Sequence, residues 1–77
     1  MNITYVLISC EVAAEKSILA ELKSLESVKE LSSLFGSYDI IVKLEAVSEE
    51  ELKEIVVSKI RNLKKIRTTV TLRVKDI

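Results

Sequence analysis

The stretch of this sequence best suited to binding chemistry surrounds its only glycine, Gly36, which Ser37, Tyr38 and Asp39 follow directly. The chain has no proline, so Gly36 is the residue that can take a positive φ without steric cost, and we expect a tight turn there. Backbone amides and hydroxyl groups at a turn can receive a carboxylate, while an aspartate can pair with an ammonium group. Together they suit a small zwitterion such as an amino acid. The residues alone leave open a simpler interpretation, in which Asp39 only caps the turn and Tyr38 only packs.

The sequence has few residues of the types that catalysis or metal binding requires. The chain has no histidine, so a nucleophile would need Lys, Asp or Glu as its partner, and the cluster Glu49–Glu51 fits the start of a helix better. With one cysteine, Cys10, neither an intrachain disulfide nor a Cys/His zinc site can form. Cys10 shares a strand face with Val6 and Ile8, which indicates a core residue. We therefore expect no enzyme, no metal and no cofactor.

The charge pattern predicts neither nucleic acid nor a membrane as a direct partner. Basic and acidic residues balance at 12 each. The basic group Arg61, Lys64, Lys65 and Arg67 has no interleaved aromatic residues, and it coincides with an expected helix end that favours cations. The apolar runs are far too short to cross a bilayer, and the start of the chain lacks the basic region of a signal peptide. We expect a cytoplasmic protein.

Periodicity predicts six elements that would position the turn. Four of them are strands, over 2–12, 28–35, 38–46 and 66–74. The first helix begins at Ala13 and has apolar positions at Ala14, Ile18, Leu22 and Leu25. The second helix begins at the capping box Ser48–Glu51 and carries the apolar stripe Leu52, Ile55, Val56, Ile60 and Leu63. Segment 28–35 also matches a helical period. Its short length and the glycine after it favour a strand with a bulge.

Alternation assigns the strand residues to two faces of a sheet. In the first strand Thr4, Val6, Ile8, Cys10 and Val12 oppose Ile3, Tyr5, Leu7, Ser9 and Glu11; in the third, Ile40, Val42 and Leu44 oppose Ile41, Lys43 and Glu45; in the last, Ile66, Thr68, Val70, Leu72 and Val74 oppose Arg67, Thr69, Thr71 and Arg73. Both faces are therefore apolar near the centre of the sheet.

The order βαββαβ predicts an α+β, ferredoxin-like fold, a four-stranded antiparallel sheet with two helices on one face. Two helices cannot cover both faces, so the second face would remain an apolar patch of the size that marks an interface. A chain of 77 residues without covalent staples also needs a partner for stability. We expect a homodimer in which two sheets pack face to face, an assembly of the dimeric α+β barrel type.

The stretch Gly36-Ser37-Tyr38-Asp39 resembles the Gly-x-Tyr/Phe-Asp signature of the effector-binding module of the Lrp/AsnC family, called RAM. Residues 5–8 and 28–31 resemble the first and second strands of that module, and residues 66–71 resemble its closing Val-x-x-Thr-x-Thr strand. The resemblance covers nearly the whole chain. Where the family often has Pro-Gly or Gly before the second and fourth strands, this chain has Glu26-Ser27 and Lys64-Lys65.

This resemblance implies a ligand site and an assembly. Gly36, Ser37, Tyr38 and Asp39 would form the loop side of a site for an amino acid or a related small molecule, and Thr69 and Thr71 would add hydroxyl groups. Dimers of the family assemble further, often into octamers, and bind effectors between dimers. Full-length regulators are a further partner that the resemblance suggests. Family regulators normally carry an N-terminal helix-turn-helix, whereas the first strand here begins near Met1, so we expect a single stand-alone domain over 1–77 without DNA binding of its own.

Two other functional classes stay open at this point. The first is a purely structural oligomerisation module, whose turn binds nothing and only mediates contacts between dimers. The second is an enzyme of the dimeric α+β barrel type, which the missing histidine disfavours.

Overall fold

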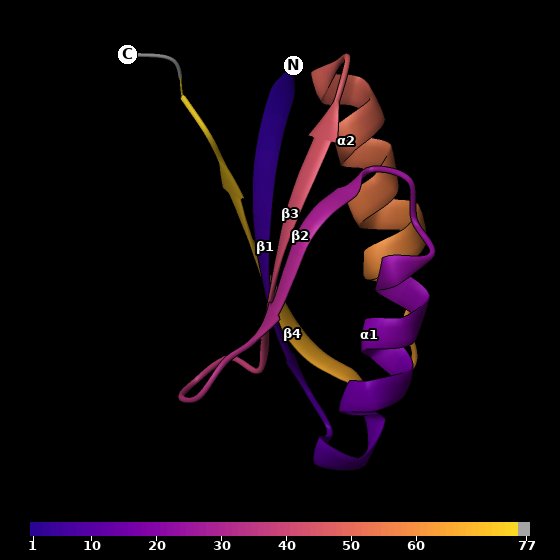
Figure 1. Cartoon of the computed structure of the whole chain (residues 1–77), viewed down its shortest axis with the longest axis vertical. Coiled ribbons are helices and arrows are strands. Elements are labelled where there is room, and N and C mark those ends of the chain that lie inside the picture. Colours follow the sequence, from indigo (N-terminus) through magenta and orange to yellow (C-terminus); the bar gives the residue numbers. More distant parts are fainter. Residues whose placement is uncertain (76–77) are drawn as a thin grey trace.

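The computed structural model of the chain describes residues 1–75, so the last two residues of the expected domain over 1–77 lie outside it. Its elements run in the order βαββαβ (Figure 1). They are β1 (Asn2–Cys10), the 3-10 turn η1 (Val12–Ala14), α1 (Glu15–Lys23), β2 (Val28–Ser33), β3 (Ile40–Ala46), α2 (Glu49–Ile55), its continuation as the π-helical turn η2 (Val56–Ile60), and β4 (Ile66–Arg73).

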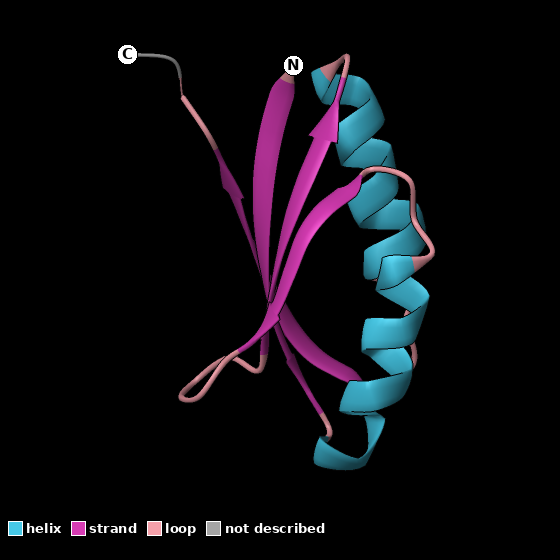
Figure 2. Cartoon of the chain, viewed as in Figure 1, coloured by secondary structure: helices cyan, strands magenta, loops and turns pink. Residues whose placement is uncertain are grey.

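The four strands form one sheet in the order β2-β3-β1-β4, in which every neighbouring pair is antiparallel. Both helices cover the same face of this sheet, and the opposite face is free of helices (Figure 2). This arrangement confirms the ferredoxin-like fold expected from the sequence. Segment 28–35 forms strand β2 over Val28–Ser33, which agrees with the expected strand rather than a helix. The pairing of β2 with β3 shifts register between Val28 and Glu30, as expected for a bulge.

The core lies between the helices and the covered face, and its members follow the two periodicities. Alternate residues of β1 and β3 are wholly buried, and the helices contribute residues three or four positions apart. The buried apolar set is Val6, Ile8, Cys10, Ala14, Ile18, Leu22, Ile40, Val42, Leu44, Ala46, Leu52, Val56 and Ile60. Ser48 caps α2 by accepting a hydrogen bond from the Glu51 amide at 3.2 Å, which is one of the two bonds of the expected capping box.

Two strand ends differ from the expectation. Val12, assigned to the same face of the first strand as Val6 and Ile8, is instead the first residue of η1 and is 90% exposed. The chain turns away there because the amide of Glu11 bonds to the Lys65 carbonyl and the amide of Ala14 bonds back to the Glu11 carbonyl. Phe35, placed at the end of the second strand, lies in the following turn and is fully exposed.

The face assignment of β4 is wrong at Ile66, because a bulge interrupts the alternation. Ser9 pairs with Thr68 and Cys10 pairs with Ile66, so Arg67 is left without a partner on β1. One extra residue moves a strand residue to the other face. Ile66 therefore packs against the core on the helix side, although it was grouped with residues that lie on the open face.

Among residues 1–75 no helix is long and apolar enough to cross a membrane.

Candidate functional site

Three hydrogen bonds hold the turn over residues 34–39 between β2 and β3. The Leu34 amide donates to the Asp39 carbonyl at 2.7 Å, and the Asp39 amide donates to the Ile8 carbonyl at 2.8 Å. The Asp39 carboxylate accepts a bond from the Cys10 amide at 2.9 Å. A side chain thus replaces the backbone carbonyl that β3 would otherwise offer to the end of β1. The turn is anchored to the central strand at its base.

The tip of the turn presents backbone amides without partners. Gly36 has φ 122°, a conformation that other residues rarely adopt, which explains why the only glycine stands here. The amides of residues 35–38 have no hydrogen-bond partner within the described part of the chain. Phe35, Gly36 and Ser37 are exposed and Tyr38 is half-buried. Such a series of amides, with the Ser37 hydroxyl beside it, can receive a carboxylate.

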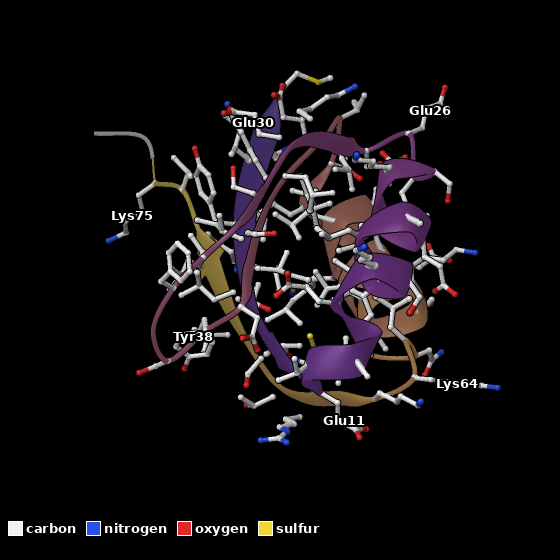
Figure 3. The ribbon with its side chains drawn as sticks, turned by 60° about the horizontal axis from the view of Figure 1, so that its bottom comes forward. Glu11, Glu26, Glu30, Tyr38, Lys64 and Lys75 are labelled. Carbon is white, nitrogen blue, oxygen red and sulfur yellow. The ribbon has the colours of Figure 1, made fainter. Side chains whose placement is uncertain are left out.

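The turn bends away from the helices, toward the open face of the sheet (Figure 1). Figure 3 shows Tyr38 on this side, with the helices on the other side of the sheet. The Asp39 side chain is half-buried at the base of the turn, and only one of its two carboxylate oxygens carries a bond to the described residues. The second oxygen can therefore accept from an added group.

The structure places Thr69 and Thr71 on the helix side of β4. Thr69 pairs with Ile8 and Thr71 pairs with Val6, and both partners point into the core. The two threonines share a face, as alternation predicts. They are on the opposite face of the sheet from the tip of the turn. One chain therefore does not bring the six expected site residues together, and any site that uses them all has to combine different subunits.

The described residues provide little for catalysis or metal binding. No group of three or more Asp, Glu or Cys side chains within residues 1–75 could hold a metal ion. Burial raises the pKa of the Cys10 thiol, and the nearby negative charge of Asp39 raises it further. Cys10 is 4% exposed, so its thiol is protonated at neutral pH and has little access to a reagent.

The open face carries a central apolar patch. Tyr5 and Leu7 of β1, Ile41 of β3 and Val70 and Leu72 of β4 share this face, since Leu7 pairs with both Ile41 and Val70 and Tyr5 pairs with Leu72. Leu72 is 48% exposed. We call these five residues the open-face patch. A contiguous apolar patch without a covering element is typical of a protein interface.

Charged residues border the open-face patch on the side of β2. Lys43 lies beside Tyr5 and forms ion pairs with Glu30 at 3.1 Å and Glu45 at 3.8 Å. The hydrogen bond that the Lys43 ammonium group donates to the Glu30 carboxylate raises the pKa of Lys43. The apolar centre and the charged border match the usual anatomy of an interface.

Sequence reasoning missed a cavity of about 320 Å³ between α2 and β4. Its lining includes Glu49, Lys53, Val57 and Arg61 from the helix and Arg73 from the strand. The helical residues follow one another at intervals of four, which places them along one side of a helix. That interval was visible in the sequence, but nothing local indicated which strand would face it.

The family model that matches this chain is the Lrp/AsnC ligand binding domain, over residues 3–76. The chain is 31% identical over 58 residues to an uncharacterized HTH-type transcriptional regulator of Pyrococcus furiosus, a match that covers 75% of this chain and 39% of the regulator. It is 40% identical over 55 residues to the homocitrate synthase of Saccharolobus solfataricus, which covers 71% of this chain and 12% of the enzyme. The chain thus spans less than half the length of these curated relatives.

Solved structures share the whole fold. The crystal structure of FFRP-DM1 matches with a TM-score of 0.93 and 28% identity, over 97% of this chain and 100% of that one. The structure of Escherichia coli AsnC matches with a TM-score of 0.88 and 30% identity, over 99% of this chain and 52% of that one. A transcriptional regulator from Neisseria meningitidis, crystallised in complex with L-Met, matches with a TM-score of 0.87 over 97% of this chain and 50% of that one. At 12% identity, this match shows only that the two proteins share a fold.

Proposed function

The chain belongs to the Lrp/AsnC ligand-binding domain family, and from this premise we propose that it is a regulatory, non-enzymatic module that binds an amino acid or a related small molecule. The observation that carries the proposal is the turn over residues 34–39. It combines unpartnered amides at residues 35–38 with the half-buried carboxylate of Asp39. The amides suit the carboxylate of an amino acid, and Asp39 suits its ammonium group.

The proposed site is completed by a second subunit. The tip of the turn and the two threonines lie on opposite sides of the sheet, so Thr69 and Thr71 would come from a neighbouring chain. We propose a homodimer that buries the open-face patch of each chain, with dimers assembling into higher oligomers such as octamers. A ligand that joins subunits favours the assembled state by mass action. Ligand concentration would then control the assembly.

The relatives support a regulatory role. They include a regulator of the HTH type and, over a short segment, a biosynthetic enzyme. A ligand-binding domain can sense a small molecule both in a transcriptional regulator and in an enzyme. A regulator with the same fold was crystallised with L-Met. We further propose a cytoplasmic location and mixed assembly with full-length Lrp/AsnC regulators as the route to transcription.

Isothermal titration calorimetry with each of the common amino acids tests the ligand. We expect one or a few to bind, and we expect the Asp39→Asn variant to bind them about tenfold more weakly. This variant keeps an oxygen for the Cys10 amide, removes the charge and replaces the second oxygen with an NH2 group. Glu54→Gln, an exposed carboxylate on α2, is the matched control and should bind normally. Binding by none of them, or equal binding by Asp39→Asn, would remove the proposed site.

A purely structural oligomerisation module is the second candidate. The hydrogen bond from the Cys10 amide favours it, because the Asp39 carboxylate already has a function within the fold. Multi-angle light scattering separates the two candidates. The sensor predicts a mass that changes with the amino acid, whereas the structural module predicts the same oligomer with and without it.

A further inference from the structure

We propose that the cavity between α2 and β4 is a second ligand site, specific for a small organic acid that has an apolar tail and no ammonium group. Its volume of about 320 Å³ is within the range of small-molecule sites. It is separate from the turn over residues 34–39. It lies beside residues 2–4 of β1 on the helix side, whereas the turn adjoins Ile8 and Cys10 and bends toward the open face.

Three of the six residues in the helical wall of the cavity are apolar. Leu52 and Val56 line it from the core side and are each 4% exposed. Val57 lines it farther out and remains 55% exposed, although it is a large apolar residue on a helix that otherwise buries its apolar side. An apolar tail that covered Val57 would remove this surface from water.

A π-helical turn gives this wall its shape. The amide of Arg61 bonds to the Val56 carbonyl, five residues back, at 2.9 Å. The three residues Val56, Val57 and Arg61 of this wider turn all line the cavity. Isolated π turns inside helices occur frequently at functional sites.

The strand wall offers hydroxyl groups. Thr4 and Thr71 both line the cavity on the helix side of the sheet. Thr4 is only 3% exposed, and its hydroxyl has no hydrogen-bond partner among residues 1–75. Every fully enclosed polar side-chain atom in that part of the chain is paired, so the Thr4 hydroxyl is not fully enclosed. It is available to a ligand oxygen.

The charged rim selects an anion. Lys53, Arg61 and Arg73 supply three positive charges and Glu49 supplies one negative charge. Glu49 is already paired with Arg73 at 2.5 Å, an ion pair that joins α2 to β4. Lys53 and Arg61 have no acidic partner within 4.0 Å in the described part of the chain. The rim therefore favours a carboxylate, and the described residues that line it offer no free acid to an ammonium group.

NMR titration with octanoate, below its micelle concentration, tests the site. We expect the amide signals of Leu52, Val57 and Thr71 to shift, while octylamine and leucine leave them unchanged. The double variant Lys53→Gln/Arg61→Gln should bind octanoate at least about fivefold more weakly, and added salt should have the same effect. Lys16→Gln, a cation on the exposed side of α1, is the matched control and should bind normally.

Three results would overturn the proposal. Octylamine could shift the same signals as strongly, which would mark an unselective apolar surface. Octanoate could shift only signals outside the cavity. Finally, octanoate could fail to bind while Val57→Asp lowers the molecular mass in light scattering, which would show that another copy of the chain covers the cavity. Each readout is independent of amino-acid binding at the turn, which Asp39→Asn tests.

Discussion

The carboxylate of Asp39 accepts a hydrogen bond from the backbone amide of Cys10, 29 positions earlier in the chain, at 2.9 Å. The bond joins the turn over residues 34–39 to the end of β1. Asp39 thus has a structural function and a proposed binding function, and substitutions can separate them because the structural bond needs an oxygen but not a charge.

We expect Asp39→Ala to lower the free energy of unfolding by about 1–3 kcal/mol, because it leaves the Cys10 amide without its acceptor. Asp39→Asn retains an acceptor oxygen and should cost clearly less. Urea unfolding followed by circular dichroism, at a fixed protein concentration, measures both. Equal losses in the two variants would show that the charge, rather than the bond, stabilises the turn.

Lys65 adopts φ 67°, the left-handed conformation, immediately before β4. The family resemblance has glycine in this region. A residue with a side chain pays about 1–2 kcal/mol there, and glycine loses about 0.5–1 kcal/mol of extra chain entropy. We therefore expect Lys65→Gly to raise the free energy of unfolding by about 0.5–1 kcal/mol.

Lys64→Gly provides the control for this prediction. Lys64 does not have a positive φ, so glycine should only add entropy to the unfolded chain and reduce stability. Chemical denaturation of the two variants, under the same conditions, measures the free energy of unfolding of each. Stabilisation of both, or of neither, would contradict the strain assigned to Lys65.

The buried Cys10 thiol predicts a loss of stability at alkaline pH. Burial raises its pKa in the folded protein above the ordinary 9.0. Below that value the thiol is protonated in both states and contributes no pH dependence. Above it the unfolded chain ionises while the folded chain keeps the proton, so the free energy of unfolding falls as pH rises.

Cys10→Ala isolates this contribution from those of Lys and Tyr. The variant should be less stable at neutral pH, because it removes a buried group, and its stability should fall less steeply toward about pH 10. Thermal unfolding across the pH series provides the comparison. Parallel curves for wild type and variant would show that Cys10 does not titrate differently in the two states.

If the open-face patch is the dimer interface, a charge introduced into it should disrupt the dimer. A charge placed by Leu7→Glu lies at its centre, beside Ile41 and Val70, and should convert the proposed dimer to monomer at micromolar concentration. Val47→Glu adds the same charge at a 79% exposed loop position and should leave the mass unchanged. Sedimentation velocity reports both. A wild-type monomer would refute the interface directly.

Much of the fold was predictable because its signals are local. The capping residue Ser48, the alternation in Ile40, Val42 and Leu44, and the lone Gly36 each act through neighbours in the sequence. The errors occur where distant segments meet. Val12 leaves its strand because the amide of Glu11 bonds to Lys65, and Ile66 changes face because Arg67 bulges opposite Ser9 and Cys10.

The sequence by itself determined the type and order of the elements, the place of the turn and the two apolar faces of the central strands, because periodicity and backbone freedom are properties of short segments. Tertiary structure alone decided that Thr69 and Thr71 lie across the sheet from the tip of the turn, that Asp39 is bonded to Cys10, and that α2 and β4 line a common cavity. These relationships depend on strand register and on helix packing. Both are set by contacts between residues far apart in the chain, which local patterns do not encode.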